Sequence, residues 1–277
     1  MSSTDDIPAF LRNIRHGRGA PAEVIAEVQR RYAAIGGSPL MRITAEQGEA
    51  LEARLGQPVR VAGRLWPPYP RAVLKELIEE GVDTVVSLPL APQSAHIYNA
   101  AVERAAAELA ADGFDVELRM APSWGLEPAL LDAFVEAIDE AGAADAIVLT
   151  AHSLPMRVIE GGDPYERDFR AMAEAVTARL EGTKCRIAYQ SQGMGGGTWL
   201  GPALDDVMVE LRKDGVNALL IAPIGFVAEH VETLYDIDME AKARAEELGF
   251  ERIARMPAMD TRPRFIDALE AVARRLL

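Results

Sequence analysis

Residues 218–240, ALLIAPIGFVAEHVETLYDIDME, decide how this chain folds. Their apolar run predicts a buried strand over Val216–Pro223, and the residues after it predict a long helix over Glu229–Leu248. Open α/β sheets bind ligands where a helix begins beyond the carboxyl end of a strand. The stretch therefore predicts an α/β fold with a ligand site at this edge of a sheet.

Three carboxylates follow at a spacing of four residues: Glu232, Asp236 and Glu240. On a helix they share one face and repel one another, which costs about 0.2–0.5 kcal/mol per pair. Either water or a bound cation must offset that repulsion, and a solvated acidic face is the commoner explanation of such a run. His230 and the interleaved apolar residues weaken the explanation by solvation, because they add a nitrogen ligand and an apolar flank, so a cation site remains open.

Strands and helices alternate on both sides of this stretch. Three helices come first, over residues 5–14, 21–34 and 43–55. Strands that alternate with helices form parallel sheets through right-handed crossovers, so we expect two parallel sheets of about four strands each. The other predicted strands are 58–63, 84–90, 116–120, 146–151, 186–190 and one near 253, and the other helices are 69–80, 94–112, 127–141, 164–181, 202–214 and 263–277.

Composition narrows the classes of partner. The 277 residues are 49% hydrophobic and 26% charged, and they contain neither an apolar run of about 18 residues nor a signal-peptide pattern, so we expect a cytoplasmic protein. A net charge of −14 argues against nucleic acid and against an anionic membrane surface as partners. Residues 1–75 nevertheless carry eleven Arg and Lys against seven Asp and Glu, which suits an anionic ligand there. The single cysteine, Cys185, excludes an internal disulfide and a four-cysteine iron–sulfur cluster.

Two further strand ends carry candidate ligand contacts. His152 lies at the end of the strand in IVLTAHSLP (147–155), where side chains project into a ligand crevice, although a histidine that caps or packs at a strand end fits the same pattern. The glycine-rich loop YQSQGMGGGTWLGP (189–202) lacks the residues of a P-loop and the spacing of a dinucleotide fingerprint. Its Met194 and Trp199 suit a flat apolar ligand, with tertiary packing of Trp199 as the alternative.

Arginines gather on and beside the first helices. A guanidinium presents a planar fork that matches a carboxylate in a bidentate manner, so these residues suit a ligand that carries carboxylates. Simple solvation on the helix surface is the alternative for most of them. The residues are Arg12, Arg15, Arg18, Arg31 and Arg42.

Seven stretches together resemble the ferrochelatases, which insert ferrous iron into a porphyrin. They span almost the whole chain in the family's order. The resemblance implies a chelatase fold of two Rossmann-like domains, residues 1–116 and 117–257, with a cleft between them and helix 258–277 packed back on the first. The stretches are FLRNIRHGRG (10–19), RRYAAIGGSPL (30–40), VRVAGRLWPP (59–68), LTAHSLP (149–155), GDPY (162–165), YQSQGMGGGTWLGP (189–202) and PIGFVAEHVETLYDID (223–238).

The resemblance also implies roles for individual residues. His152 and Glu232 match the catalytic pair of the family. The helix that carries the acidic residues has a π-type turn in the family. The metal-handling residues implied in this way are His152, Glu232, Asp236 and Glu240, and those beside the porphyrin are Arg15, Arg31, Ser191 and Trp199.

The implied reaction places Fe²⁺ in coproporphyrin III or protoporphyrin IX, releases two protons and needs no cofactor beyond the iron substrate. A flat macrocycle with propionates accounts for a basic first third, an aromatic loop and an acidic helix in one chain. The IRHGRG cluster (14–19) favours coproporphyrin, which carries two more propionates than protoporphyrin. We expect a monomer without a membrane anchor or an iron–sulfur cluster, in transient contact with other haem-pathway enzymes.

The beginning of the chain departs from the family's pattern. Ferrochelatases begin with a Leu/Val-rich strand and a Gly-Pro turn, whereas this sequence enters the pattern after them. We therefore expect either that translation starts further upstream or that the first strand of domain one is absent. That expectation motivates an alternative function, a porphyrin- or haem-binding protein that lacks catalysis. A third hypothesis, a cobalt chelatase of the sirohydrochlorin type, shares the fold but not the GFVxxHxExLYD stretch (225–236).

Overall fold

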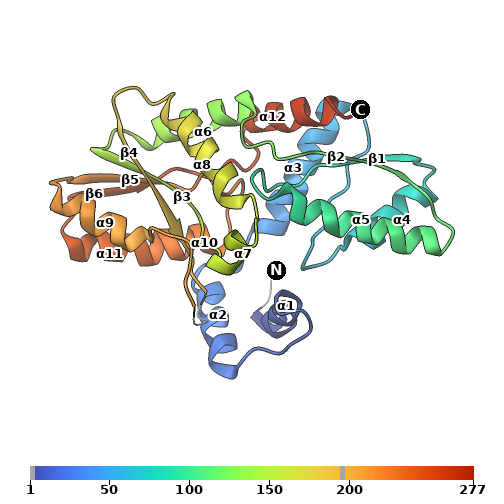
Figure 1. Ribbon diagram of the computed structural model, residues 1–277, viewed down its shortest axis with the longest axis horizontal. Coiled ribbons are helices and arrows are strands. Elements are labelled where there is room, and N and C mark those ends of the chain that lie inside the picture. The colour runs from blue at the N-terminus through green and yellow to red at the C-terminus, as the bar shows by residue number, and fades with distance from the viewer. Residues whose placement is uncertain (1–3, 194–196) are drawn as a thin grey trace.

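The computed structural model describes residues 4–193 and 197–277, in which strands and helices alternate along the chain (Figure 1). The predicted α/β class with parallel sheets is confirmed. The strands are β1 (Thr84–Ser87), β2 (Glu117–Met120), β3 (Ala146–His152), β4 (Lys184–Gln190), β5 (Ala218–Ala222) and β6 (Arg252–Arg255). After the 3₁₀ turn η1 (Thr4–Asp6), the helices are α1 (Ile7–Ile14), α2 (Ala22–Ala34), α3 (Leu40–Leu55), α4 (Pro70–Glu79), α5 (Ala95–Ala111), α6 (Pro128–Ala141), α7 (Met156–Glu160), α8 (Tyr165–Thr177), α9 (Leu204–Lys213), α10 (Val231–Leu234), the π-helix η2 (Asp236–Ala241), α11 (Lys242–Leu248) and α12 (Pro263–Arg274).

The larger sheet has the strand order β4–β3–β5–β6, and all of its pairs are parallel. Residues 146–151 of the central strand β3 are buried without a break, because helices cover both faces of the sheet. Figure 1 shows α6 and α8 on one face and α9 and α11 on the other. Ile147 and Leu149 share a core cluster with α6 and α8, whereas Val148 packs with α9, as the two-residue period of a strand requires.

The connections between strands change direction at β3 and β5. From β3 the chain passes through α8 to β4 on one side, and from β5 it passes through α11 to β6 on the other. Open α/β sheets bind ligands outside the carboxyl ends of the strands at such a switch point. His152 is the last residue of β3, and Glu232 lies in the helix that follows β5. The topology therefore brings both residues to the expected place for a ligand site.

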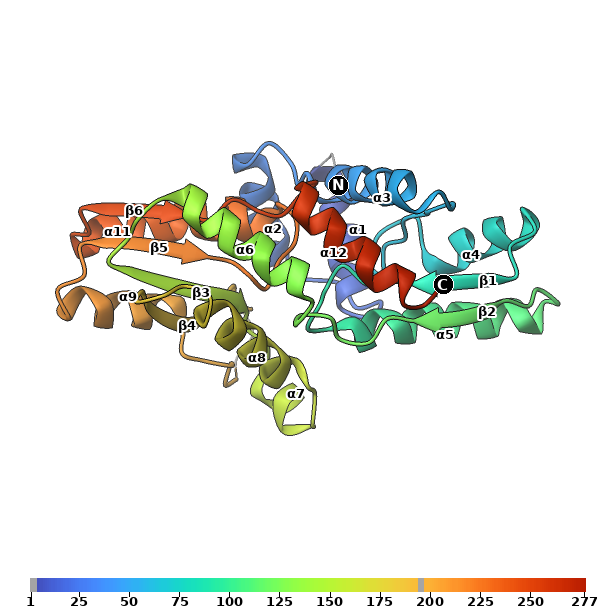
Figure 2. The same ribbon diagram turned by 90° about the horizontal axis from the view of Figure 1, so that it is seen from above.

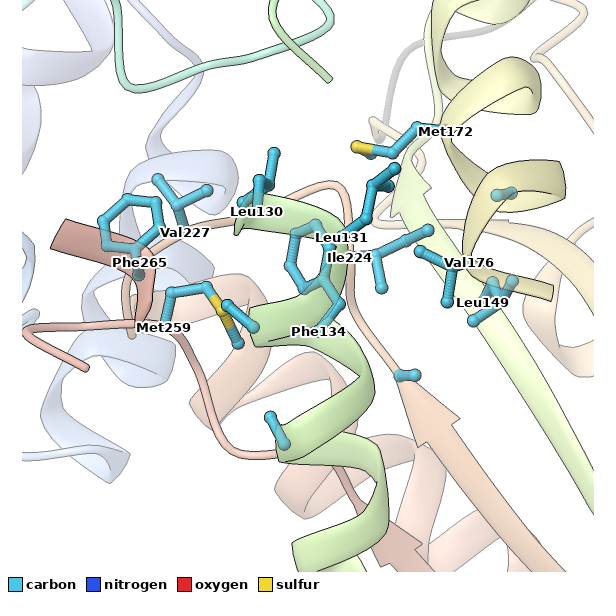
Figure 3. Close-up of a cluster of buried hydrophobic side chains, with 14 of the residues drawn as sticks. Leu130, Leu131, Phe134, Leu149, Met172, Val176, Ile224, Val227, Met259 and Phe265 are labelled. Carbon is cyan, nitrogen blue, oxygen red and sulfur yellow. The ribbon is translucent and has the colours of Figure 1, made fainter. Parts of the chain in front are cut away.

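The largest core cluster lies between the sheet and the helices α6 and α8, and Figure 3 shows its centre. Phe134 of α6 packs in this cluster with Leu149 of β3 and Val176 of α8, and all three side chains are fully buried. Met259 and Phe265, from the last part of the chain, belong to the same cluster. The cluster therefore joins α12 to the larger sheet.

The smaller sheet contains only β1 and β2 among the described residues, which corrects the expected number of about four strands. Residues 58–63, predicted as a strand, form none. Val59 and Val61 lie against Gly48 of α3, where an added side-chain carbon would come within 2.9 Å of Val61. The Val59 N–H donates to the Glu52 carboxylate at 2.8 Å. The segment therefore packs on a helix and finds its hydrogen bond there rather than on a neighbouring strand.

The chain passes from the smaller sheet to the larger one after β2. β2 pairs with β1 in parallel, so the smaller sheet extends to Met120, and the boundary expected after residue 116 falls immediately before one of its strands. Helix α12 packs against both α3 and α6, and in the view of Figure 2 it lies between α6 and the smaller sheet.

Within the described ranges, no helix is long and apolar enough to cross a membrane.

Two buried glutamines bond across to the loop that follows β5. Gln93 donates from Nε2 to the carbonyl oxygen of Gly225 at 2.8 Å. Gln47 of α3 donates to the carbonyl oxygens of Val227 and Asp260, each at 2.9 Å. Segments that are far apart in the sequence therefore fix the course of residues 225–229, immediately before α10.

The structure also corrects one helix prediction and adds one helix that was not predicted. The single helix predicted over Glu229–Leu248 consists of α10, the π-helix η2 and α11. The N–H of Glu240 bonds to the carbonyl oxygen of Tyr235 at 3.0 Å, five residues back, which is the π-helical pattern. Helix α7 was not predicted, because its five residues are too few to show a helical period.

Replacement of Phe134 by Ala is expected to lower the free energy of unfolding by about 3–5 kcal/mol, because it removes a fully buried ring from the largest cluster. Urea unfolding measures the loss. Leu126→Ala is the matched control, since Leu126 is 57% exposed and the change there should stay within about 0.5 kcal/mol. Equal losses in the two variants would contradict the assignment of this core.

Candidate active site

His152 and Glu232 meet beyond the carboxyl edge of the larger sheet. The Nδ1 atom of His152 lies 2.7 Å from Oε2 of Glu232, although the two residues are 80 positions apart in the sequence. Their side chains are 34% and 25% exposed. The pair predicted from the sequence is thus brought together in a half-buried ion pair with one edge open to solvent.

Each member of the pair shifts the pKa of the other. Burial is the largest single influence and disfavours both charged forms, but the opposite charge outweighs it. The pKa of His152 is raised, since the charge and hydrogen bond of Glu232 stabilise the imidazolium. The pKa of Glu232 is lowered to about 2 by the charge and hydrogen bond of His152, with a smaller contribution from His230. Glu232 is therefore ionised at neutral pH, and His152 is a stronger base than an isolated histidine.

The parallel pairing of β3 with β4 supports the pair. His152 lies in register with Gln190, whose Nε2 donates to the backbone oxygen of Glu232 at 2.9 Å. The hydroxyl of Thr150 donates to Gln190 Oε1 at 2.6 Å and fixes the orientation of that amide. The buried Tyr165 donates from its hydroxyl to the backbone oxygen of His152 at 2.8 Å. Backbone contacts thus hold both ends of the pair.

The acidic residues after Glu232 lie on the π-helix, whose π-type turn the resemblance implied. Arg31 of α2 donates to Asp236 Oδ1 at 3.0 Å and lies 3.3 Å from Glu240 Oε1. Ser191, which follows β4 with φ of 59°, donates its hydroxyl to Asp236 Oδ2. The pKa of Asp236 is raised to about 6, chiefly by burial and in part by the charge of Glu232, against the opposing effects of Ser191 and Arg31. Asp236 can therefore exchange a proton near neutral pH.

The predicted metal-handling residues are not clustered as a metal site. In the part of the chain that the structure describes, no group of three or more His, Cys, Asp or Glu side chains is arranged to hold a metal ion. Asp236 and Glu240 bond to Arg31 instead, and Glu232 bonds to His152. A metal role for these four residues stays a prediction.

The predicted porphyrin contacts have different environments. Arg31 and Ser191 both bond to Asp236. Trp199 pairs with Pro155 in an antiparallel bridge and lines a cavity of ≈ 250 Å³ at the start of α7. Arg15 lies in an exposed turn, where its Nε donates to the Gly19 carbonyl oxygen at 3.2 Å. Met194, also named from the sequence, lies outside the described residues.

The structure adds residues that the sequence patterns did not single out. The pKa of Tyr98 on α5 is raised, chiefly by partial desolvation and in part by the charge of Glu232, although the residue is still 38% exposed. The Arg64 guanidinium stacks over the Tyr98 ring at 5.6 Å, and its buried Nε atom has no hydrogen-bond partner among the described residues. The sequence analysis quoted the stretch that contains Arg64, but it did not single out the residue, because the position of Arg64 depends on the path of a loop without secondary structure.

A cavity of ≈ 410 Å³ beside α12 shares no residue with the site.

The chain is similar to known proteins over almost its whole length. The family model described as Ferrochelatase matches residues 2–277. A ferrochelatase of Acidobacterium capsulatum is 35% identical over 294 residues, covering 98% of this chain and 90% of the relative. A coproporphyrin III ferrochelatase of a Geobacillus species is 34% identical, with coverage of 97% and 92%.

The similar solved structures share the fold at low sequence identity. SirB from Bacillus subtilis with Fe³⁺ has a TM-score of 0.62 and 16% identity, covering 85% of this chain and 88% of its own. CbiX, a terminal enzyme of sirohaem biosynthesis in denitrifying bacteria, has a TM-score of 0.58 and 14% identity, with coverage of 86% and 93%. These two structures bear on the architecture alone.

The pair should make stability depend on pH. Glu232 has a lowered pKa, so its contribution is present above its ordinary value of 4.5 and is lost as the pH falls toward about 2. His152 has a raised pKa, so its contribution is present below its ordinary value of 6.5 and is lost as the pH rises through the raised value. Glu232→Gln should therefore lower the free energy of unfolding most between pH 4.5 and 6.5, by about 2 kcal/mol.

Urea unfolding at pH values from about 3 to about 9 measures this difference. Glu246→Gln on α11 is the control, because Glu246 is exposed and its removal should change stability equally little at every pH. A loss in Glu232→Gln that stays constant across the series would show that the ion pair contributes no stability.

Proposed function

The chain belongs to the ferrochelatase family, and from this premise we propose that His152 and Glu232 carry out the chemistry of metal insertion. Membership makes the protein an enzyme of haem biosynthesis that inserts a metal ion into a porphyrin. The observation that carries the proposal is the 2.7 Å contact between these two side chains at the switch point of the larger sheet. The alternatives, a binding protein without catalysis and a cobalt chelatase, are not favoured by these relatives.

The reaction must remove two protons from the pyrrole nitrogens as Fe²⁺ enters the ring. Glu232 stabilises a protonated His152, so the imidazole is suited to take the first proton as a general base. Glu232 itself, with a pKa of about 2, stays ionised and holds the imidazolium in place. Asp236, with a pKa of about 6, is suited to take up the second proton near neutral pH.

Ferrous iron, the substrate, would approach along Asp236 and Glu240. Carboxylate oxygens and an imidazole nitrogen are suitable ligands for Fe²⁺. The Arg31 guanidinium now neutralises both carboxylates, so the ion would exchange with it. In this proposal His152, Glu232, Asp236 and Glu240 handle the metal in succession, rather than as one fixed cage.

The porphyrin would lie beside these residues. Ser191 and Arg31 already adjoin Asp236, and Trp199 lines a cavity next to α7. Arg64 adds a cation next to Tyr98, and its buried Nε atom has no hydrogen-bond partner among the described residues. Such a cation suits a ring propionate. The exposed Arg15 would reach a propionate at the edge of the ring.

Coproporphyrin III is the proposed substrate. The basic turn at residues 14–19 suits a ring with four carboxylates, and the Geobacillus relative is named for that porphyrin. We further propose a monomer that acts in the cytoplasm without a cofactor, and that passes its product to other haem-pathway enzymes.

His152→Ala should lower kcat for Fe²⁺ insertion by at least about 10²-fold, because the general base is lost. Affinity for the porphyrin, read from fluorescence quenching, should stay within about twofold, since the ring is bound by other residues. His96→Ala is the control, because His96 bonds to Asp163 and takes no part in the pair. Near-normal turnover of His152→Ala would refute the assigned role.

Coproporphyrin III should be converted with a kcat/KM about tenfold above that of protoporphyrin IX. Arg15→Gln should narrow this ratio, since it removes one partner for the additional propionates. Arg167→Gln, at an exposed arginine on α8, should leave the ratio unchanged. A ratio of one or below in the unmodified protein would contradict the proposed substrate.

A further inference from the structure

The π-helix has a second charged side that faces away from the proposed iron route. Asp236 bonds to Arg31 and Ser191. Asp238, two residues later and hence about half a helical turn away, bonds to Arg255 and Lys242 at 2.8 and 2.7 Å. One arginine therefore holds each side of the helix, and of these two it is Arg31 that adjoins Asp236 and Glu240.

Arg255 connects three segments through a nearly buried guanidinium. It is the last residue of β6, and its side chain is 11% exposed. Its Nη1 atom lies 2.8 Å from Glu229 Oε1, and its Nη2 atom lies 2.8 Å from Asp238 Oδ2. One rigid fork thus ties the start of α10 and the middle of the π-helix to the edge of the larger sheet.

Glu229 passes this restraint to the helix that carries Glu232. Its Oε2 accepts a hydrogen bond from the hydroxyl of Thr233 at 2.5 Å, and Oε1 also accepts one from the Ala258 N–H at 3.3 Å. Thr233 is fully buried and directly follows Glu232. A shift of the Arg255 fork would therefore move α10 at the position of the catalytic carboxylate.

Stability alone does not account for a forked cation here. A buried ion pair is often no more stabilising than apolar residues of similar volume, because desolvation of the charges offsets their attraction. The geometry of a guanidinium, in contrast, is specific: its two nitrogens bond to two carboxylates at a fixed separation. Arg255 thus fixes the relative position of the Glu229 and Asp238 carboxylates, which an apolar side chain at this position would not do.

We propose that Arg255 is a positioning residue for metal insertion: through Glu229 and Asp238 it holds α10 and the π-helix so that Glu232 meets His152 while Asp236 and Glu240 stay in line with it. The inference rests on the proposed function, since it assumes that Glu232 acts in catalysis. Arg255 itself touches neither the pair nor the predicted metal route.

The test compares Arg255→Gln, Arg255→Lys and Asp238→Asn in steady-state Fe²⁺ insertion. In Arg255→Gln, Glu232 is expected to shift by about 1 Å relative to His152, which should lower kcat about 100-fold. The single amine of Arg255→Lys keeps the charge but not the fork, so it should recover only part of this loss. Asp238→Asn should lower kcat about tenfold, since it removes the ion pair of Arg255 with Asp238 and retains the one with Glu229. Affinity for coproporphyrin, read from fluorescence quenching, should stay within twofold in all three.

Arg244→Gln is the matched control, because Arg244, whose side chain is 40% exposed, joins α11 to α9 through Asp205 and should leave kcat unchanged. All assays are run at a temperature below the thermal unfolding midpoint of each variant, so that a lower kcat does not reflect unfolded enzyme. If Arg255→Gln does not fold, Asp238→Asn decides the test.

Two results would overturn the inference and are distinguishable. Folded Arg255→Gln or Asp238→Asn with kcat within twofold of the unmodified enzyme, while His152→Ala is inactive, would remove the positioning role and leave the proposed function intact. Normal turnover of His152→Ala would remove the proposed function, and the role of Arg255 with it.

Discussion

The contact between His152 and Glu232 is the constraint on which the rest of the structure depends. Burial disfavours the charge on both side chains, and each partner offsets much of that cost for the other. A 2.7 Å contact across 80 residues of sequence requires two backbones that do not move relative to each other. The register of β3 with β4 supplies one restraint, because it places Gln190 beside His152 and within reach of the Glu232 carbonyl oxygen. The geometry of the site is thus an extension of the sheet.

The acidic residues beyond this pair show how the charge of the chain is organised. Their spacing allowed two explanations, solvation or a cation, and the structure adds a guanidinium from α2, Arg31. The basic first third of the sequence and its acidic remainder therefore meet at this helix. In the proposed reaction a ferrous ion competes with Arg31 for the same oxygens, so the strength of that ion pair limits how firmly iron is held. A route that binds its ion weakly can also release it.

Local patterns predicted much of this structure, and long-range packing explains what they missed. The buried run of β3 and the helix after β5 were clear in sequence, and with the switch-point rule they placed His152 and Glu232 at one edge. The strand predicted over 58–63 failed because Val59 and Val61 pack on α3, a contact that alternation along one segment does not reveal. The spacing of the acids fits an α-helix and a π-helix about equally, so it did not show the change of hydrogen bonding at Tyr235. Arg255 and Gln190 act through partners 17 and 42 residues away, beyond any local period.

The loop at residues 225–229 explains how the two parts of the chain influence one site. Gln93 and Gln47 donate to its carbonyl oxygens, and both side chains are almost fully buried. Loss of such a bond leaves a buried polar group unpaired, at a cost of about 1–3 kcal/mol for each. The loop leads directly into α10 and Glu232, so a movement of the first part of the chain against the larger sheet must either break these bonds or displace the Glu232 carboxylate. Gln47 and Gln93 therefore couple the position of the first part of the chain, relative to the larger sheet, to the alignment of Glu232 with His152.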